Sequence, residues 1–277
     1  MKKVILGAAL CSAAVAFAGP ANADANSDFW SAAENAITDW LLGGPSSAAS
    51  SSGSLAGPTD ADFLSGSTNA LVLGATGVPT PNASYISEAT HLYLDPNGYD
   101  GTTASTLALT TPETYTFDTS VLDGQNDLIN AIVTDYNAGE MGCNAAGVCS
   151  DPLTIFTYSQ SSAIAALAEH QLQVDKIPED ALRFVMLGAN PTGVPDNLYP
   201  TEVYNIDGDI WAQPTTIGST WEQILLGLGL HEAYLGLTQA EVNSATTVAE
   251  GLTTVHDIPT LTFPELFDAF INVWTGQ

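Results

Sequence analysis

Short apolar segments alternate with longer segments of helical periodicity along most of the chain. Apolar runs of three to six residues predict strands, and apolar positions three and four residues apart predict helices between them. The predicted strands cover 70–73, 107–109, 153–158, 184–187 and 203–206, and the clearest predicted helices cover 121–136 and 161–172. Such alternation predicts an α/β fold, in which helices flank a central, mostly parallel sheet on both faces.

The N-terminus has the features of an export signal. Lys2 and Lys3 precede an uncharged run over 4–18 that is rich in Ala, Val and Leu, and a small-x-small cleavage site ends at Ala23. A transmembrane helix needs about 20 apolar residues, and this run is shorter. We therefore expect residues 1–23 to be removed, and the protein to be secreted or associated with the cell envelope, without an integral membrane segment.

The region after the signal divides into a leader and a main domain. Apolar positions at helical spacing predict a helix over 28–42, and residues 45–57 form a Ser-, Ala- and Gly-rich linker. We assign residues 24–65 to this helix and linker, and residues 66–277 to the α/β domain.

The composition is strongly acidic and narrows the range of partners. The chain has 31 Asp and Glu but only 4 Lys and Arg, which gives a formal net charge of −27 at pH 7. Proteins bind nucleic acids and anionic headgroups through positive surfaces, so neither is an expected partner. Hydrophobic residues make up 45% of the chain, which argues against disorder in spite of the charge.

Two cysteines remain after removal of the signal, and they lie close together. Cys143 and Cys149 are six positions apart, in a chain expected to meet an oxidising compartment. A metal site would require further ligands, but no His and no other Cys occurs between residues 92 and 169. The pair therefore predicts a disulfide, and neither a metal nor another cofactor is expected.

The segment 153–161 runs from a predicted strand into a predicted helix, with Ser159 at the turn. A nucleophile elbow has this arrangement, because the strained turn presents the serine hydroxyl and the helix N-terminus stabilises negative charge. Thr157 and Ser161 occupy the two positions that usually carry glycine, and the β-branched Thr157 departs from the pattern. The alternative interpretation is a serine that caps an ordinary helix.

An oxyanion hole requires backbone N–H groups near such a serine. The N–H of Gln160 is the expected first donor, and Ala75 or Thr76 in the glycine-rich loop 74–78 is the expected second donor. A phosphate-binding role for this loop is disfavoured because it contains neither lysine nor arginine.

Six short motifs follow one another along the chain: Gly74-Ala75-Thr76-Gly77-Val78-Pro79-Thr80-Pro81, Thr110-Thr111-Pro112-Glu113, Tyr158-Ser159-Gln160-Ser161, Ile206-Asp207-Gly208, Gly229-Leu230-His231-Glu232-Ala233-Tyr234 and Ile258-Pro259-Thr260. In this order they resemble the PE-PPE domain, over roughly residues 66–270. The resemblance implies a cutinase-like serine α/β-hydrolase from an actinobacterial envelope, here in a stand-alone copy.

The resemblance also implies a Ser-Asp-His triad in that chain order, with Ser159, Asp207 and His231 at the matching positions. A serine hydroxyl attacks a carbonyl only when an imidazole removes its proton, and a carboxylate must hold the imidazole in the right tautomer. Two alternatives remain open, because Asp209 also follows the strand and His256 also follows both acids.

The sequence thus predicts a secreted serine esterase or lipase that hydrolyses short- to medium-chain acyl esters through an acyl-enzyme. The alternatives are an acyltransferase that passes the acyl chain to a sugar or glycerol hydroxyl, and an inactive hydrolase fold that serves as an envelope module. The segment between Asp207 and His231 contains Trp211, Trp221 and several leucines. It is either an apolar cover over the acyl site or an ordinary amphipathic helix.

Overall fold

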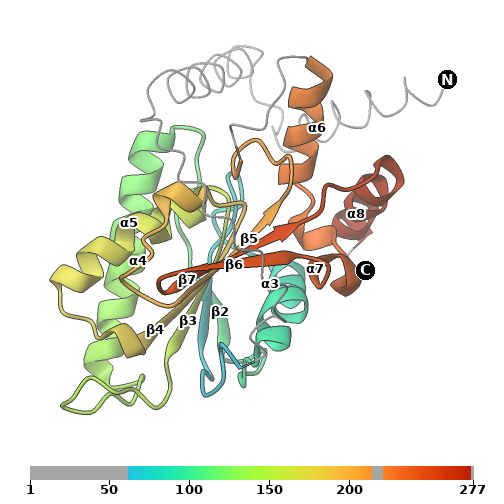
Figure 1. Cartoon of the computed structure of the whole chain (residues 1–277). Helices are drawn as coiled ribbons and strands as arrows, with labels where there is room; N and C mark the ends of the chain where they lie inside the picture. The colour runs from blue at the N-terminus through green and yellow to red at the C-terminus, as the bar shows by residue number, and fades with distance from the viewer. Residues whose placement is uncertain (1–61, 214–220, 276–277) are drawn as a thin grey trace. The chain divides into compact units, whose positions relative to one another are not determined.

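The computed structural model describes residues 62–213 and 221–275. The predicted export signal over 1–23, helix over 28–42 and linker over 45–57 lie outside these residues. One seven-stranded sheet has the strand order β2-β1-β3-β4-β5-β7-β6 (Figure 1). Neighbouring strands are parallel except for β6 and β7, which are antiparallel. The predicted α/β fold is confirmed.

The strands are β1 Ala70–Val72, β2 Thr106–Ala108, β3 Leu153–Tyr158, β4 Leu182–Leu187, β5 Thr201–Ile206, β6 Thr246–Glu250 and β7 Thr253–Ile258. The helices are α3 Ala83–Ala89, α4 Phe117–Ala138, α5 Gln160–Val174, α6 Trp221–His231, α7 Gln239–Val242 and α8 Phe263–Thr275. Shorter helical turns occur at Thr90–Leu94, Asp95–Asn97, Glu179–Ala181, Pro191–Gly193 and Tyr234–Gly236.

All five predicted strands are present, and their ends agree with the prediction to within two residues. Strand β3 agrees at both ends, because a continuous buried apolar run with β-branched and aromatic residues favours a central parallel strand. Strands β6 and β7 were not predicted. Both are rich in threonine. β6 is the edge strand and β7 lies next to it, and their half-exposed side chains weaken the apolar pattern.

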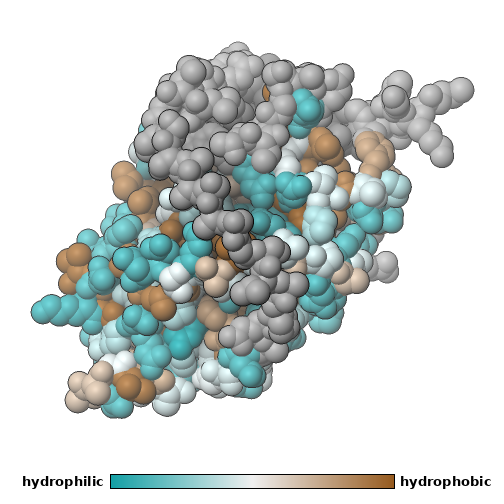
Figure 2. Space-filling view, viewed as in Figure 1, coloured by the Kyte–Doolittle hydropathy of each residue, from teal (hydrophilic) through white to brown (hydrophobic). Residues whose placement is uncertain are grey.

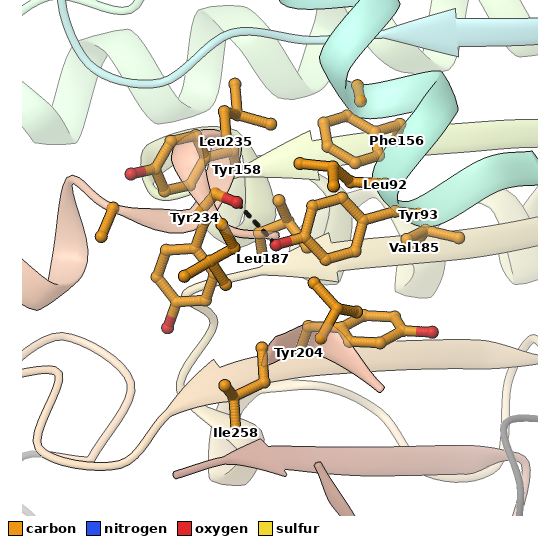
Figure 3. Close-up of a cluster of buried hydrophobic side chains, with 14 of the residues drawn as sticks. Leu92, Tyr93, Phe156, Tyr158, Val185, Leu187, Tyr204, Tyr234, Leu235 and Ile258 are labelled. Carbon is orange, nitrogen blue, oxygen red and sulfur yellow. Dashed lines mark hydrogen bonds between the residues drawn. The ribbon is translucent and has the colours of Figure 1, made fainter. Parts of the chain in front are cut away.

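Side chains alternate between the two faces of the sheet, and each face carries its own buried cluster. Helices α4 and α5 cover one face (Figure 1), where Ile155 and Phe184 of the sheet meet Leu128 and Ile164 of the helices. On the other face the cluster is rich in tyrosine (Figure 3), and the Tyr93 hydroxyl donates a hydrogen bond of 2.8 Å to the Tyr234 carbonyl. This second face supports the residues that lead to the candidate active site.

The predicted disulfide is confirmed. Cys143 and Cys149 are bridged and close a short loop just before β3.

Hydrophilic side chains mix with small hydrophobic patches over the part of the surface that Figure 2 shows. Among residues 62–213 and 221–275, no helix has the length and apolarity needed to cross a membrane.

Glu169 of α5 is a fully buried acid with 0% exposure. Neither carboxyl oxygen has a hydrogen-bond partner among the described residues. Burial raises the pKa of Glu169 to about 9, so the folded protein holds this proton at neutral pH. The unfolded chain releases the proton above the ordinary pKa of glutamate, so folding becomes less favourable as the pH rises from that value towards the folded pKa.

We therefore expect Glu169→Gln to stabilise the protein at alkaline pH. At pH 8 its free energy of unfolding should exceed that of the wild type by about 2–4 kcal/mol, and the difference should disappear near pH 4.5. Urea unfolding at several pH values measures this, and Glu250→Gln on the exposed edge strand is the matched control. A constant difference across the pH range would mean that Glu169 does not carry a buried proton.

Candidate active site

Ser159 lies at a strained turn between β3 and α5. Its backbone has φ 63° and ψ −119°, and its N–H donates to the Leu187 carbonyl at 2.9 Å. A positive φ is unusual for a residue other than glycine and is typical of functional sites. The side chain makes no capping hydrogen bond to α5, so the alternative of an ordinary capping serine is wrong. Instead, the hydroxyl lies 2.7 Å from Nε2 of His231.

Thr157, which departs from the usual pattern of small residues, fits into this turn through its hydroxyl. It is fully buried, and its Oγ1 lies 3.1 Å from Oγ of Ser162. Ser162 donates in turn to the Leu187 carbonyl at 3.0 Å, and Ser161 donates to the Tyr158 carbonyl at 3.0 Å. Short hydroxyl side chains therefore satisfy the polar groups of the elbow where strand and helix come close together.

His231 is the last residue of α6 and is buried. Its Nε2 faces Ser159, its Nδ1 faces a carboxylate, and its carbonyl accepts a hydrogen bond from the Tyr158 hydroxyl. The ring of Trp211 lies beside it, with 5.9 Å between the ring centroids. The imidazole is thus held from several sides with one nitrogen directed at the serine.

The carboxylate that pairs with His231 belongs to Asp209, so the expectation of Asp207 is corrected. Both oxygens of Asp209 lie within hydrogen-bonding distance of Nδ1, at 2.9 and 3.0 Å. Asp207 is exposed and bonds instead with Thr260. The reason is the turn after β5, where Gly208 has φ +92° and redirects the chain, so that the second acid and not the first points inward.

Asp209 is completely buried, and its charge is balanced by hydrogen bonds. Besides His231, it accepts from the Tyr234 hydroxyl at 2.7 Å and from the Trp211 backbone N–H at 2.8 Å. The Tyr234 oxygen itself accepts from the N–H of Ile206 at 2.9 Å. These contacts fix the carboxylate plane and, through it, the orientation of the imidazole.

His256, the alternative base, takes part in a different pair. It lies on β7, is buried, and its Nε2 is hydrogen-bonded to Glu202 of β5. Its ring stacks on Tyr204 with 4.2 Å between centroids. Asp257, its neighbour in sequence, accepts instead from Gln213. The structure therefore brings His231 to Ser159 and leaves His256 in the core of the sheet.

The side chain of Gln160 links the start of α5 to the loop that carries the other expected oxyanion donors. The Gln160 side chain donates to the Thr114 carbonyl at 3.0 Å, and its Nε2 lies 3.5 Å from Oγ1 of Thr76. The backbone N–H of Ala75 is hydrogen-bonded to the Tyr85 hydroxyl. This bond lowers the pKa of Tyr85, but burial raises that pKa by more. Thr76 is therefore the stronger candidate for the loop donor, beside the N–H of Gln160.

Two residues that support the site were not singled out from the sequence. Gly188 follows β4 with φ +58°, and a Cβ there would lie only 2.9 Å from Cε1 of His231. Glycine is needed for both the backbone angle and the space. Tyr234 is the second; it is the last residue of the motif that contains His231, but the motif alone assigns it no role.

The electrostatics of His231 reflect two opposing effects. Burial lowers its pKa, but the charge of Asp209 and the hydrogen bond to it raise the pKa, and the net result lies above the ordinary value. A serine, an imidazole and a carboxylate in series can move a proton from the serine to the imidazole as the hydroxyl attacks an electrophile. Among the described residues, no group of three or more His, Cys, Asp or Glu could hold a metal ion.

Comparison with known proteins confirms the resemblance to the PE-PPE domain family. Residues 78–197 match the PE-PPE domain, and this segment contains Ser159 but ends before Asp209 and His231. The chain is 29% identical over 248 residues to the Mycobacterium tuberculosis protein "Uncharacterized PPE family protein PPE28", covering 74% of this chain and 36% of that protein. It is 28% identical over 218 residues to "Esterase PE16" of the same organism, covering 65% of this chain and 39% of the relative.

The chain thus spans less than half the length of these two relatives. No solved structure matches it.

The corrected acid gives a direct test against its neighbour. Asp209→Asn should lower kcat for a soluble p-nitrophenyl ester by roughly 10²–10⁴-fold, because an amide cannot hold the required tautomer of His231. Asp207→Asn is the matched control and should retain kcat to within about twofold. The reverse ranking in steady-state kinetics would return the role to Asp207.

The raised pKa of His231 sets the acid limb of the pH profile. The imidazole must be neutral to accept the serine proton, so kcat/KM should fall as the pH drops through a value above about 6.5. Asp209→Asn removes the negative charge, so whatever activity remains should show this limb at lower pH. If the acid limb of Asp209→Asn lies at the same pH as that of the wild type, a group other than His231 is responsible for it.

Proposed function

We propose that this chain, in which residues 78–197 match the PE-PPE domain, is a serine hydrolase that cleaves carboxylic esters through an acyl-enzyme. One observation carries the proposal: the continuous hydrogen-bonded series from Ser159 through His231 to the buried Asp209. A relative named as an esterase supports the same reaction class. The short distances in the series also favour an active enzyme over an inactive envelope module.

In the first half of the reaction, Oγ of Ser159 attacks the ester carbonyl carbon while Nε2 of His231 takes the hydroxyl proton. The carbonyl oxygen becomes an oxyanion, and the N–H groups of Gln160 and Thr76 are the proposed donors to it. His231 then gives its proton to the leaving alcohol oxygen as the ester C–O bond breaks. The alcohol departs and an acyl-Ser159 ester remains.

In the second half, water attacks the acyl-Ser159 carbonyl while His231 takes a proton from that water. The tetrahedral intermediate collapses, the proton passes to Oγ of Ser159, and the free carboxylic acid leaves. Asp209 keeps its negative charge throughout and stabilises the imidazolium that forms twice. The reaction requires no cofactor.

We propose short- to medium-chain acyl esters or envelope lipids as substrates. The supporting feature is the apolar character of the residues that precede His231, with Trp211 half-buried beside the imidazole and apolar residues in α6. Secretion is likewise proposed, and it is supported by the N-terminal signal pattern and by the disulfide between Cys143 and Cys149.

Replacement of the nucleophile tests the reaction class. Ser159→Ala should reduce turnover of p-nitrophenyl butyrate to near background, a loss of roughly 10³-fold or more, because no other hydroxyl replaces Oγ. The fold should be kept, as judged by circular dichroism and thermal unfolding. Ser87→Ala, at an exposed position of α3, is the matched control and should retain full activity. Turnover by Ser159→Ala at the wild-type rate would show that Ser159 is not the nucleophile.

A partition experiment distinguishes hydrolysis from acyl transfer. An acyl ester is supplied together with millimolar trehalose or glycerol, and the products are separated by mass. We expect free acid to exceed transfer product, because the segment before His231 is mainly apolar and unsuited to holding a sugar. An excess of transfer product would make the protein an acyltransferase.

A further inference from the structure

Glu113 is a buried acid in a strained conformation. It is 1% exposed and has φ +44°, an angle rarely adopted by residues other than glycine. One carboxyl oxygen accepts from the Thr111 hydroxyl at 2.8 Å, and the other has no partner among the described residues. A strained backbone and a half-satisfied buried carboxyl both cost stability, and such features gather at functional sites.

The backbone around Glu113 is hydrogen-bonded to the glycine-rich loop and to the residue that follows it. The Glu113 carbonyl accepts from the N–H of Gly77 at 2.7 Å, and the N–H of Thr111 donates to the Pro79 carbonyl at 3.0 Å. The loop from Gly74 to Val78 is therefore held on one side by this segment.

The residue after Glu113 connects the same segment to the helix that follows the nucleophile. The Thr114 carbonyl accepts from Nε2 of Gln160, and the Thr114 N–H donates to the Ser120 hydroxyl at 2.9 Å. Ser120 donates in turn to Oε1 of Gln160 at 2.7 Å. The two segments that carry the proposed oxyanion donors, the start of α5 at Gln160 and the loop next to Gly77, thus contact Glu113 or its neighbour Thr114.

The charge of the Glu113 carboxyl also affects Tyr85, which contacts the glycine-rich loop. Burial is the largest cause of the raised pKa of Tyr85, and the charge of Glu113 is the next. The same Tyr85 hydroxyl faces the N–H of Ala75 and donates to the Leu73 carbonyl at 3.3 Å. A charged Glu113 would place an anion close to the loop where the oxyanion must form.

The titratable groups named around Glu113 are tyrosines and an acid, and none of them is a cation that could pair with its carboxyl. Tyr85 lies on α3, and Tyr115 lies beside Gly77. The negative charge of Glu232 contributes to the raised pKa of both tyrosines. The two cations among the described residues, Lys176 and Arg183, lie between the end of α5 and the start of β4, near the amino end of that strand. Glu113 instead follows the carboxyl end of β2. Burial raises the pKa of Glu113 to about 7, against the smaller, lowering effect of the Thr111 hydrogen bond.

We infer that Glu113 is a positioning residue for the oxyanion donors, active as the uncharged acid and inhibitory when it ionises. This inference rests on the proposed hydrolase function. The neutral carboxyl holds the loop through Thr111 without opposing the oxyanion. The ionised carboxylate repels the oxyanion and draws loop N–H groups towards itself, which weakens a contact made only in the transition state.

The test uses Glu113→Gln, which keeps the shape and the hydrogen bond from Thr111 but cannot ionise. Wild-type kcat should decline about tenfold or more between pH 7 and 9, with KM nearly constant, whereas Glu113→Gln should keep its kcat over this range. Glu88→Gln on α3 is the control and should decline like the wild type. Thr111→Val removes the pKa-lowering hydrogen bond and should move the decline to higher pH.

A second measurement does not require turnover and separates this inference from the proposed function. The amide NMR signals of Thr76 and Gln160 should show a titration component with a midpoint near the Glu113 pKa of about 7 in the wild type and in Ser159→Ala. Glu113→Gln should lose this component and keep only the one that His231→Ala removes. If Ser159→Ala retains activity, the proposed function fails, whatever these signals do. If the alkaline decline persists in Glu113→Gln, or the amide titration is the same in Glu113→Gln as in the wild type, the role of Glu113 is overturned.

Discussion

The buried carboxylate of Asp209 is the group on which the rest of the site depends. A buried charge is tolerated only when it is paired and hydrogen-bonded, and Asp209 obtains its partners from His231, Tyr234 and the backbone of Trp211. Tyr234 in turn accepts a bond at its carbonyl from Tyr93 of the hydrophobic cluster (Figure 3). The position of the imidazole is therefore fixed by the core of the domain and not by a mobile loop.

A shortage of cations shapes the interior as well as the surface. Four carboxyls are buried among the described residues: Glu113, Glu169, Glu202 and Asp209. Neither lysine nor arginine pairs with any of them, so two carboxyls pair with the buried histidines His231 and His256. The other two have raised pKa values and can remain neutral by keeping a proton. Proton binding thus performs the role that arginine or lysine has in less acidic proteins.

The sequence predicted the sheet and the strand-to-helix turn at Ser159 because both depend on local patterns. The apolar run of β3, the turn at Ser159 and the following helix are contiguous, so their geometry follows from neighbouring residues. The pairing acid is different, because Asp207 and Asp209 both follow β5 and only the turn at Gly208 decides which one points inward. The contributions of Gly188 and Tyr234 depend on packing between distant segments, which no local pattern reveals.

Covalent labelling of the protein tests the central claim, that Ser159 is an activated nucleophile, most directly. The protein is treated with a fluorophosphonate at neutral pH, and the adduct is located by peptide mass spectrometry. The account predicts one adduct, on Ser159, formed rapidly by the wild type and by His256→Ala and very slowly by His231→Ala. An unlabelled wild-type protein, or an adduct on another serine, would contradict it.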